Sequence, residues 1–198
     1  MTIAVSRGFA TGFVITPVDL GPMSRGRVQA LRFSSILFPH DPRASFLVVN
    51  VYLQAGGTNG VRLGQLETIF GLDADLPLFL LGDFNMVETT SDAPGPRSGI
   101  ILGGLEKERW DRFILHFKLR EVVQDSHTHF FTAAVPEDCR SSRIDRVYTS
   151  LKEEELAVLC PGAETVTPQA RGKGWGDTGA PPAFFPQKAS LASPSRYC

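Results

Sequence analysis

LPLFLLGDFN, residues 76–85, is an apolar run that ends abruptly at a glycine, an aspartate and an asparagine. The apolar part is typical of a short strand that is buried on both faces. Gly82 permits a sharp turn or a close backbone approach, and Asp83 and Asn85 offer a carboxylate and an amide at the strand end. If the chain stays extended, both point to one side and Phe84 points into the core. This pattern indicates a ligand site or an ordinary turn, where Asp and Asn are favoured for geometry alone.

Strand-like segments flank this stretch. Residues 12–16, 28–37 and 46–53 are rich in β-branched and aromatic side chains and are separated by Gly, Pro, Asp and Ser clusters, which predicts three strands. Towards the C-terminus, the sequence predicts strands at 128–132, 143–150 and 155–160.

Two segments follow the helical period instead. Residues 62–72 and 106–120 carry apolar side chains at helical spacing, and the second has an aromatic stripe that we expect in the core: Trp110, Phe113, Ile114 and Phe117. The Pro- and Gly-rich residues 91–99 predict a surface loop. Strands interleaved with helices predict a layered α/β (α+β) fold.

Length and composition allow one domain with a trailing segment. The chain has 198 residues, 42% of them hydrophobic, a formal net charge of −1 and three cysteines. We expect a folded domain over 1–160 and a poorly ordered Pro-, Gly- and Ser-rich tail over 161–198. The charge balance argues against a strong non-specific nucleic-acid binder, and we interpret the arginine clusters, Arg27 among them, as solvated loop charges.

Taken in order, several motifs resemble the endonuclease/exonuclease/phosphatase superfamily, the DNase I-like phosphodiesterases. The matching pieces are GRVQAL, FLVVNVYLQAGG, the helix RLGQLETIFGL, PLFLLGDFN and SRIDRVYTS. GDFN together with the later SRID is the most specific pair, and it looks most like the endonuclease domain of non-LTR retrotransposons. The resemblance implies a DNase I-like β-sandwich flanked by helices.

The resemblance also implies roles for individual residues. Asp83 would deprotonate or position the attacking water, Asn85 would hold the phosphate or the nucleophile, and Tyr52 would contact the phosphate through its hydroxyl. Asp145 would orient a catalytic His, and Arg143 would contact substrate. A divalent cation, Mg²⁺ or Mn²⁺, would stabilise the charge on the phosphoryl oxygens.

Two parts of the family pattern are missing from the sequence. The first strands, which carry an Asn and the metal-binding Glu of a Gln-Glu pair, are not found, and neither is the C-terminal Ser-Asp-His. We therefore expect an N-terminally truncated domain with reduced or no phosphodiesterase activity and no metal ligand that can be named. The alternatives are a non-catalytic remnant or binding module, and a phosphatase or deadenylase of the same superfamily.

The remaining expectations concern partners and location. By resemblance, the partner is nucleic acid, with DNA favoured. No signal peptide and no apolar stretch of about 18 to 20 residues is found, so we expect no membrane insertion. We expect an intracellular protein, with the nucleus as one option.

Overall fold

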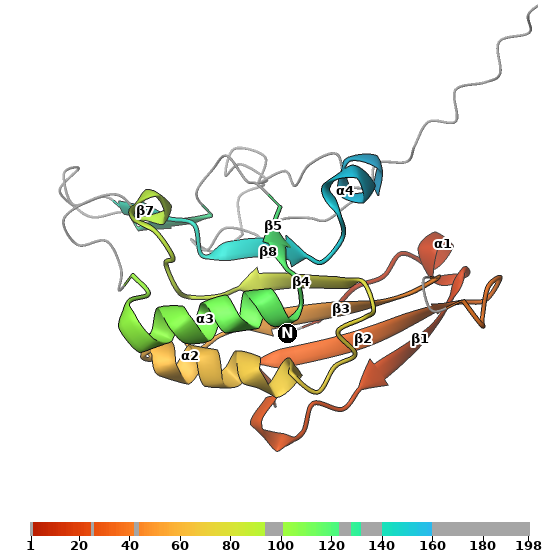
Figure 1. Ribbon diagram of the computed structural model, residues 1–198, viewed down its shortest axis with the longest axis horizontal. Helices are drawn as coiled ribbons and strands as arrows, with labels where there is room; N and C mark the ends of the chain where they lie inside the picture. The colour runs from red at the N-terminus through yellow and green to blue at the C-terminus, as the bar shows by residue number, and fades with distance from the viewer. Residues whose placement is uncertain are drawn as a thin grey trace, which may run out of the picture.

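A six-stranded mixed sheet forms the centre of the computed structural model, which describes residues 2–24, 26–41, 44–93, 101–122, 128–131 and 140–159 (Figure 1). Parallel pairing occurs between β3 and β4, and the other neighbours in this sheet pair antiparallel. In spatial order the strands are β1 (Phe13–Val18), β2 (Val28–Ser35), β3 (Ser45–Tyr52), β4 (Leu78–Asp83), β8 (Asp145–Thr149) and β5 (Arg120–Glu121).

Shorter elements complete the described residues. A second sheet pairs β6 (His129–Phe131) with β7 (Arg140–Ser142), and a short helix, α1 (Arg7–Ala10), precedes β1. The strand predicted over 143–150 is confirmed as β8, which begins two residues later than predicted, and β7 is a separate strand that ends just before the predicted segment. The predicted tail, 161–198, and most of the predicted loop, 91–99, lie outside the described residues.

The crossover between the parallel strands β3 and β4 contains α2 (Asn59–Leu66), which continues as the 3₁₀ turn η3 (Glu67–Ile69). This helix begins before the predicted residue 62 because Thr58 caps it: the Thr58 hydroxyl accepts a hydrogen bond of 3.3 Å from the Val61 N–H. Such a cap satisfies one of the backbone donors left open at a helix start.

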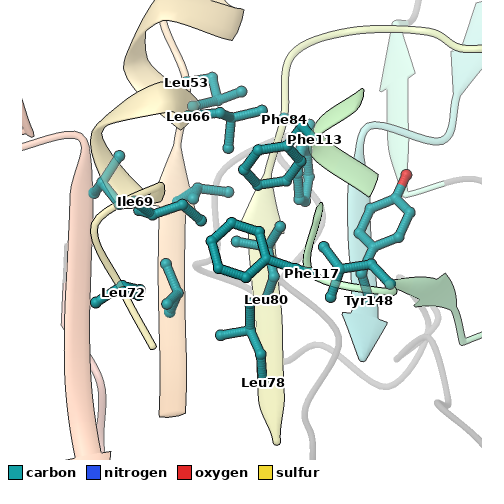
Figure 2. Close-up of a cluster of buried hydrophobic side chains, with 14 of the residues drawn as sticks. Leu53, Leu66, Ile69, Leu72, Leu78, Leu80, Phe84, Phe113, Phe117 and Tyr148 are labelled. Atoms are coloured by element: carbon teal, nitrogen blue, oxygen red, sulfur yellow. The ribbon is translucent and has the colours of Figure 1, made fainter. Parts of the chain in front are cut away.

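One face of the sheet carries the main hydrophobic core. Helices α2 and α3 (Gly104–His116) lie side by side over this face (Figure 1). The predicted stripe of α3 points inward, with Trp110, Phe113 and Phe117 buried and Ile114 packed against the cluster. Figure 2 shows side chains from both helices and from β4 and β8 meeting in this cluster. Their burial is the main source of the fold's stability.

The opposite face of the sheet is less well covered. Along β3, side chains that point towards the helices are buried, and those that point away are half-buried or, at Tyr52, exposed. An aromatic cluster lies on this second face, where Phe33 and Phe46 stack with ring centroids 4.8 Å apart and rings from Phe9 and Phe13 pack against them. The expectation that this strand is covered equally on both faces is thus only partly met.

The predicted strand over 155–160 is wrong, since Glu153–Leu159 forms the helix α4. Three glutamates occupy its first turn, where negative side chains are favoured by the helix dipole. The Glu155 carboxylate also accepts a 2.8 Å hydrogen bond from the Lys152 N–H just before the helix. This polar start outweighs the strand-like apolar residues that follow.

Gly82 leaves no room for a side chain. Its φ is +133°, and a Cβ added there would lie 2.0 Å from the Val51 carbonyl oxygen on β3. Any side chain would push the parallel strands apart at the point where the chain leaves β4. The glycine of the GDFN motif is thus needed for backbone approach.

We predict that Gly82→Ala lowers the free energy of unfolding by about 3 kcal/mol or more, because backbone strain and displacement of β3 add together. Urea denaturation measures the loss. Gly64→Ala is the matched control: Gly64 lies in α2 with nothing within 4 Å of an added Cβ, so stability should stay equal or rise. Equal stability of Gly82→Ala and the native chain would contradict the close approach.

Candidate active site

Three of the residues singled out from the sequence lie in one row across adjacent strands. Tyr52, the last residue of β3, is the register partner of Asp83, the last residue of β4. Asp83 is in turn the register partner of Asp145, the first residue of β8. Register partners project from the same face of a sheet, so the phenol and the two carboxylates share the face opposite the helices.

The Asp83 carboxylate has a shifted acidity. Burial and the neighbouring charge of Asp145 raise its pKa from an ordinary 3.8 to about 6, against the opposing effect of hydrogen bonds from Asn85 and the charge of Arg62. Asp145 itself is only 7% exposed, and its backbone N–H donates to the Thr128 hydroxyl at 3.1 Å. Asp83 and Asp145 are register partners with little exposure to solvent. Two neighbouring carboxylates in such surroundings favour a shared proton or a cation between them.

Asn85 holds the turn that follows β4. Its φ is +48°, so the chain does not stay extended here and the expected same-side arrangement with Asp83 is replaced by a turn. The Asn85 N–H donates to Asp83 Oδ1 at 2.8 Å, and its side-chain Nδ2 donates to the Leu53 carbonyl at 2.9 Å. Asn85 thereby orients Asp83 and ties it to the end of β3. Phe84 is fully buried in the core, as predicted.

Tyr52 has an arginine neighbour that the sequence analysis assigned to a solvated loop. The Arg27 guanidinium lies over the Tyr52 ring, 5.3 Å from its centroid, and Arg27 Nη1 donates to the Tyr52 carbonyl at 3.5 Å. The Tyr52 side chain remains 45% exposed. Arg27 directly precedes β2, so its position follows from the pairing of β2 with β3 rather than from any local motif.

Arg62 of α2 is a second arginine that the sequence analysis did not assign to the site. It is 8% exposed; its Nε donates to the Gln54 carbonyl at 3.0 Å and its Nη1 to Asn59 Oδ1 at 2.9 Å. Burial lowers the pKa of Arg62 and the charge of Asp83 raises it in part. The guanidinium therefore contributes positive potential near Asp83 from a fixed position.

Beside the row lies a buried network of charges. Asp92 accepts ion pairs of 2.7 Å from both Arg143 and Arg146, Arg146 also contacts Glu88 at 2.8 Å, and Arg143 contacts Glu121 at 2.8 Å. Burial alone would raise the pKa of Asp92, but the hydrogen bonds and charges of the two arginines hold it well below its ordinary value. The network fixes the segment after Asn85 against the start of β8.

Arg143 was expected to contact substrate. Its side chain is 18% exposed and its guanidinium is bound to the carboxylates of Asp92 and Glu121, while its backbone N–H donates to the Asp92 carbonyl at 2.8 Å. Next to it, the Ile144 carbonyl accepts a 2.8 Å hydrogen bond from the Phe84 N–H. Arg143 therefore fixes the backbone segment that leads into Asp145, the first residue of β8.

Tyr148 links this network to the core. Its ring packs between Phe84 and Trp110, and its hydroxyl, which points away from the apolar cluster in Figure 2, donates to Glu88. Burial raises the pKa of this phenol well above its ordinary value, so it remains a neutral donor. No local sequence signal indicates this network, because its members are distant in the chain.

The described residues contain no cluster of three or more His, Cys, Asp or Glu side chains that could hold a metal ion. Asp83 and Asp145 form a pair rather than a cage. Of the histidines, His116 packs against the rings of Phe70 and Phe117, which is a structural position. None of the helices in the described part of the chain has the length and apolar character that crossing a bilayer requires.

No protein-family model matches the sequence, and no curated protein matches it. Solved structures do match. The endonuclease domain of TRAS1, a telomere-specific non-LTR retrotransposon, superposes with a TM-score of 0.50 at 11% identity, over 74% of this chain and 59% of that one. An AP endonuclease from Archaeoglobus fulgidus gives a TM-score of 0.49 at 16% identity, over 76% of this chain and 62% of that one.

The superposition on the TRAS1 endonuclease domain confirms the fold class expected from the motifs. The chain has a DNase I-like α/β fold. It spans about 60% of the length of the two structures, 59% and 62% respectively. At this level of identity the likeness extends to the fold alone.

We predict that Asp83 titrates with a midpoint near pH 6, measured from the ¹³C shift of its carboxyl carbon. In Asp145→Asn the midpoint should fall, because a neighbouring negative charge is removed. Asp75→Asn, at an exposed position outside the row, is the control and should leave it unchanged. A midpoint near 4 would contradict the burial of the Asp83 carboxylate, and a midpoint insensitive to Asp145→Asn would show that the two carboxylates are not neighbours.

The same shift predicts a pH-dependent effect on stability. Because the folded chain raises the pKa of Asp83 from 3.8 to about 6, folding favours its protonated form, and the destabilising charge is present above pH 6 and disappears as the pH falls towards 4. Asp83→Asn should therefore stabilise the protein at pH 7.5 and have little effect at pH 4.

Proposed function

We propose that this domain hydrolyses phosphodiester bonds of nucleic acid, DNA first among them, with the help of Mg²⁺ or Mn²⁺ and at a reduced rate. The observation that carries the proposal is the row formed by Tyr52, Asp83 and Asp145. In this row a phenol, whose hydroxyl can donate to a phosphate oxygen, lies beside two carboxylates at one end of the sheet. A titratable carboxylate with a pKa near 6 suits general-base work near neutral pH.

The carboxylate pair fits a divalent cation. The Asp145 charge raises the pKa of Asp83, so a cation between the two would offset their repulsion. Mg²⁺ in proteins is commonly held by one or two carboxylates, with water and substrate phosphates completing its shell. Asp83 and Asp145 would hold it, and it would supply charge stabilisation at the phosphoryl oxygens.

Residues of this chain supply the proton acceptor, the hydrogen-bond donor to phosphate and the contacts that position them. Asp83 accepts a proton from the water that attacks phosphorus, while the bond from phosphorus to the leaving oxygen breaks and that oxygen takes up a proton from solvent. Asn85 fixes the Asp83 carboxylate through its N–H, and the hydroxyl of Tyr52, an exposed residue, donates to a phosphate oxygen. Arg143 acts through the segment that it holds beside Asp145.

The fold likeness to a retrotransposon endonuclease domain supports the reaction class. A second candidate function, a non-catalytic binding module of the same fold, is favoured by one observation: the described residues offer two neighbouring carboxylates and no cluster of three or more potential metal ligands. Both candidates use the same surface, and they differ in whether a bond is broken.

Plasmid nicking in the presence of Mg²⁺ separates the two candidates. We expect the native chain to nick supercoiled DNA. The rate for Asp83→Ala should be lower by about 100-fold or more, since the proton acceptor is lost. Asp75→Ala, an exposed carboxylate outside the row, is the matched control and should keep full activity.

Equal nicking by Asp83→Ala and the native chain would refute the hydrolytic role of the row. Binding of DNA by a native chain that nicks nothing, with either Mg²⁺ or Mn²⁺, would select the binding module.

A further inference from the structure

Arg146 is a buried arginine that directly follows Asp145 in β8. Because side chains alternate along a strand, Asp145 belongs to the row and Arg146 projects from the other face of the sheet, towards the helices. Arg146 is only 1% exposed. Burying a guanidinium is costly unless protein groups replace its water, so its partners determine where this side chain lies.

The Arg146 guanidinium joins two segments that are far apart in the chain. Its Nε donates to the Arg143 carbonyl at 3.2 Å, just before β8. On the other side, Nη1 donates to Glu88 Oε1 at 2.8 Å and Nη2 lies 2.7 Å from Asp92 Oδ2. Glu88 and Asp92 both belong to the segment that follows β4, so one side chain ties this segment to the start of β8.

These contacts lie on both sides of the two carboxylates of the row. Asp83 ends β4 and Asp145 begins β8. Between them runs one backbone hydrogen bond, in which the Phe84 N–H donates to the Ile144 carbonyl at 2.8 Å. Arg146 holds the chain after Phe84 through its ion pairs and the chain before Asp145 through its Nε. The spacing of the two carboxylates therefore depends on this guanidinium.

Tyr148 connects the guanidinium to the core. Its ring packs against Phe84 and Trp110, with ring centroids 5.3 and 5.5 Å apart. Its hydroxyl accepts a 3.2 Å hydrogen bond from Arg146 Nη1 and donates to Glu88. The phenol cannot shift without disturbing the packed rings, so the position of the arginine fork is set from the core side as well.

We propose that Arg146 is a positioning residue for the hydrolysis: its guanidinium sets the separation of the Asp83 and Asp145 carboxylates from the opposite face of the sheet, without touching substrate. The inference rests on the proposed function for the reaction, whereas the link between the two segments concerns this chain alone. Arg143 differs from Arg146, since its ion pairs are with Asp92 and Glu121 and do not include Glu88.

The first measurement tests the link without any reaction. Arg146→Lys keeps the positive charge, but one ammonium lacks the planar fork that contacts both carboxylates and the Arg143 carbonyl together. NMR detects a scalar coupling between the Phe84 nitrogen and the Ile144 carbonyl carbon only across an intact hydrogen bond. We expect this coupling in the native chain and its loss in Arg146→Lys.

The second measurement separates kcat from KM for plasmid nicking in Mg²⁺. Arg146→Lys should lower kcat about 10- to 100-fold, because misplaced catalytic groups react slowly. KM should stay within about 3-fold of the native value, because the residue does not bind DNA. Glu88→Ala should lower kcat likewise, and the double variant no further, since both changes break one link.

Leu66→Ala is the matched control for lost stability. Leu66 is a core residue of α2, 1% exposed, and its truncation weakens packing without removing a charge. Below its unfolding temperature, this variant should keep both the Phe84–Ile144 coupling and the native kcat. Circular dichroism confirms that each variant is folded.

The outcomes separate this inference from the proposed function. A native kcat in Arg146→Lys, an equal fall of kcat in Leu66→Ala, or a raised KM with unchanged kcat would overturn the positioning role and keep hydrolysis. A native chain that nicks nothing would overturn the proposed function. In that case, loss of the coupling in Arg146→Lys alone would support the link between the two segments, and an unchanged coupling would overturn it.

Discussion

The register of β4 against its two neighbours is the constraint on which the site depends. Pairing with β3 places Asp83 beside Tyr52, and pairing with β8 places it beside Asp145. Since successive side chains of a strand alternate between faces, a slip of one residue would turn Asp83 towards the helices and bring Phe84 out of the core. The absent side chain of Gly82 allows the close β3–β4 approach at this register, and the burial of Phe84 opposes any shift.

Two groups of charged side chains, one in this row and one beside it, differ in the sign of the charges that they bring together. The buried network of Asp92, Arg143 and Arg146 pairs opposite charges closely, and these ion pairs fix backbone segments. In the row itself the two carboxylates repel each other and the pKa of Asp83 rises. Two neighbouring carboxylates, one of them with a raised pKa, are typical of a place where a cation or a proton takes part in function.

Much of this arrangement could be predicted from the sequence. The apolar run that ends in GDFN forms β4 with Asp83 at its end, and the aromatic stripe of α3 is in the core. These features are local, because periodicity and composition determine them within one segment. The helix α4 could not be predicted, since an apolar run as short as residues 155–160 fits either element and three glutamates at the first turn decide it.

The features that the sequence did not indicate are those that depend on distant pairing. Arg27 resembles any loop arginine until β2 pairs with β3 and brings it over the Tyr52 ring. Arg146 and Asp92 are far apart in the chain, and neither lies in a pattern that predicts a buried charge. Likewise, the turn at Asn85 replaces the extended backbone expected there, because its N–H binds the Asp83 carboxylate.

Paramagnetic broadening by Mn²⁺ tests most directly whether this register creates one cation-binding carboxylate site. In a ¹⁵N-labelled chain titrated with Mn²⁺, the amide signals of Asp83, Asn85 and Asp145 are predicted to broaden first and together, and Asp83→Asn is predicted to abolish that early broadening. Early broadening at the acidic start of α4, Glu153–Glu155, with the signals of Asp83 and Asp145 unaffected, would contradict it.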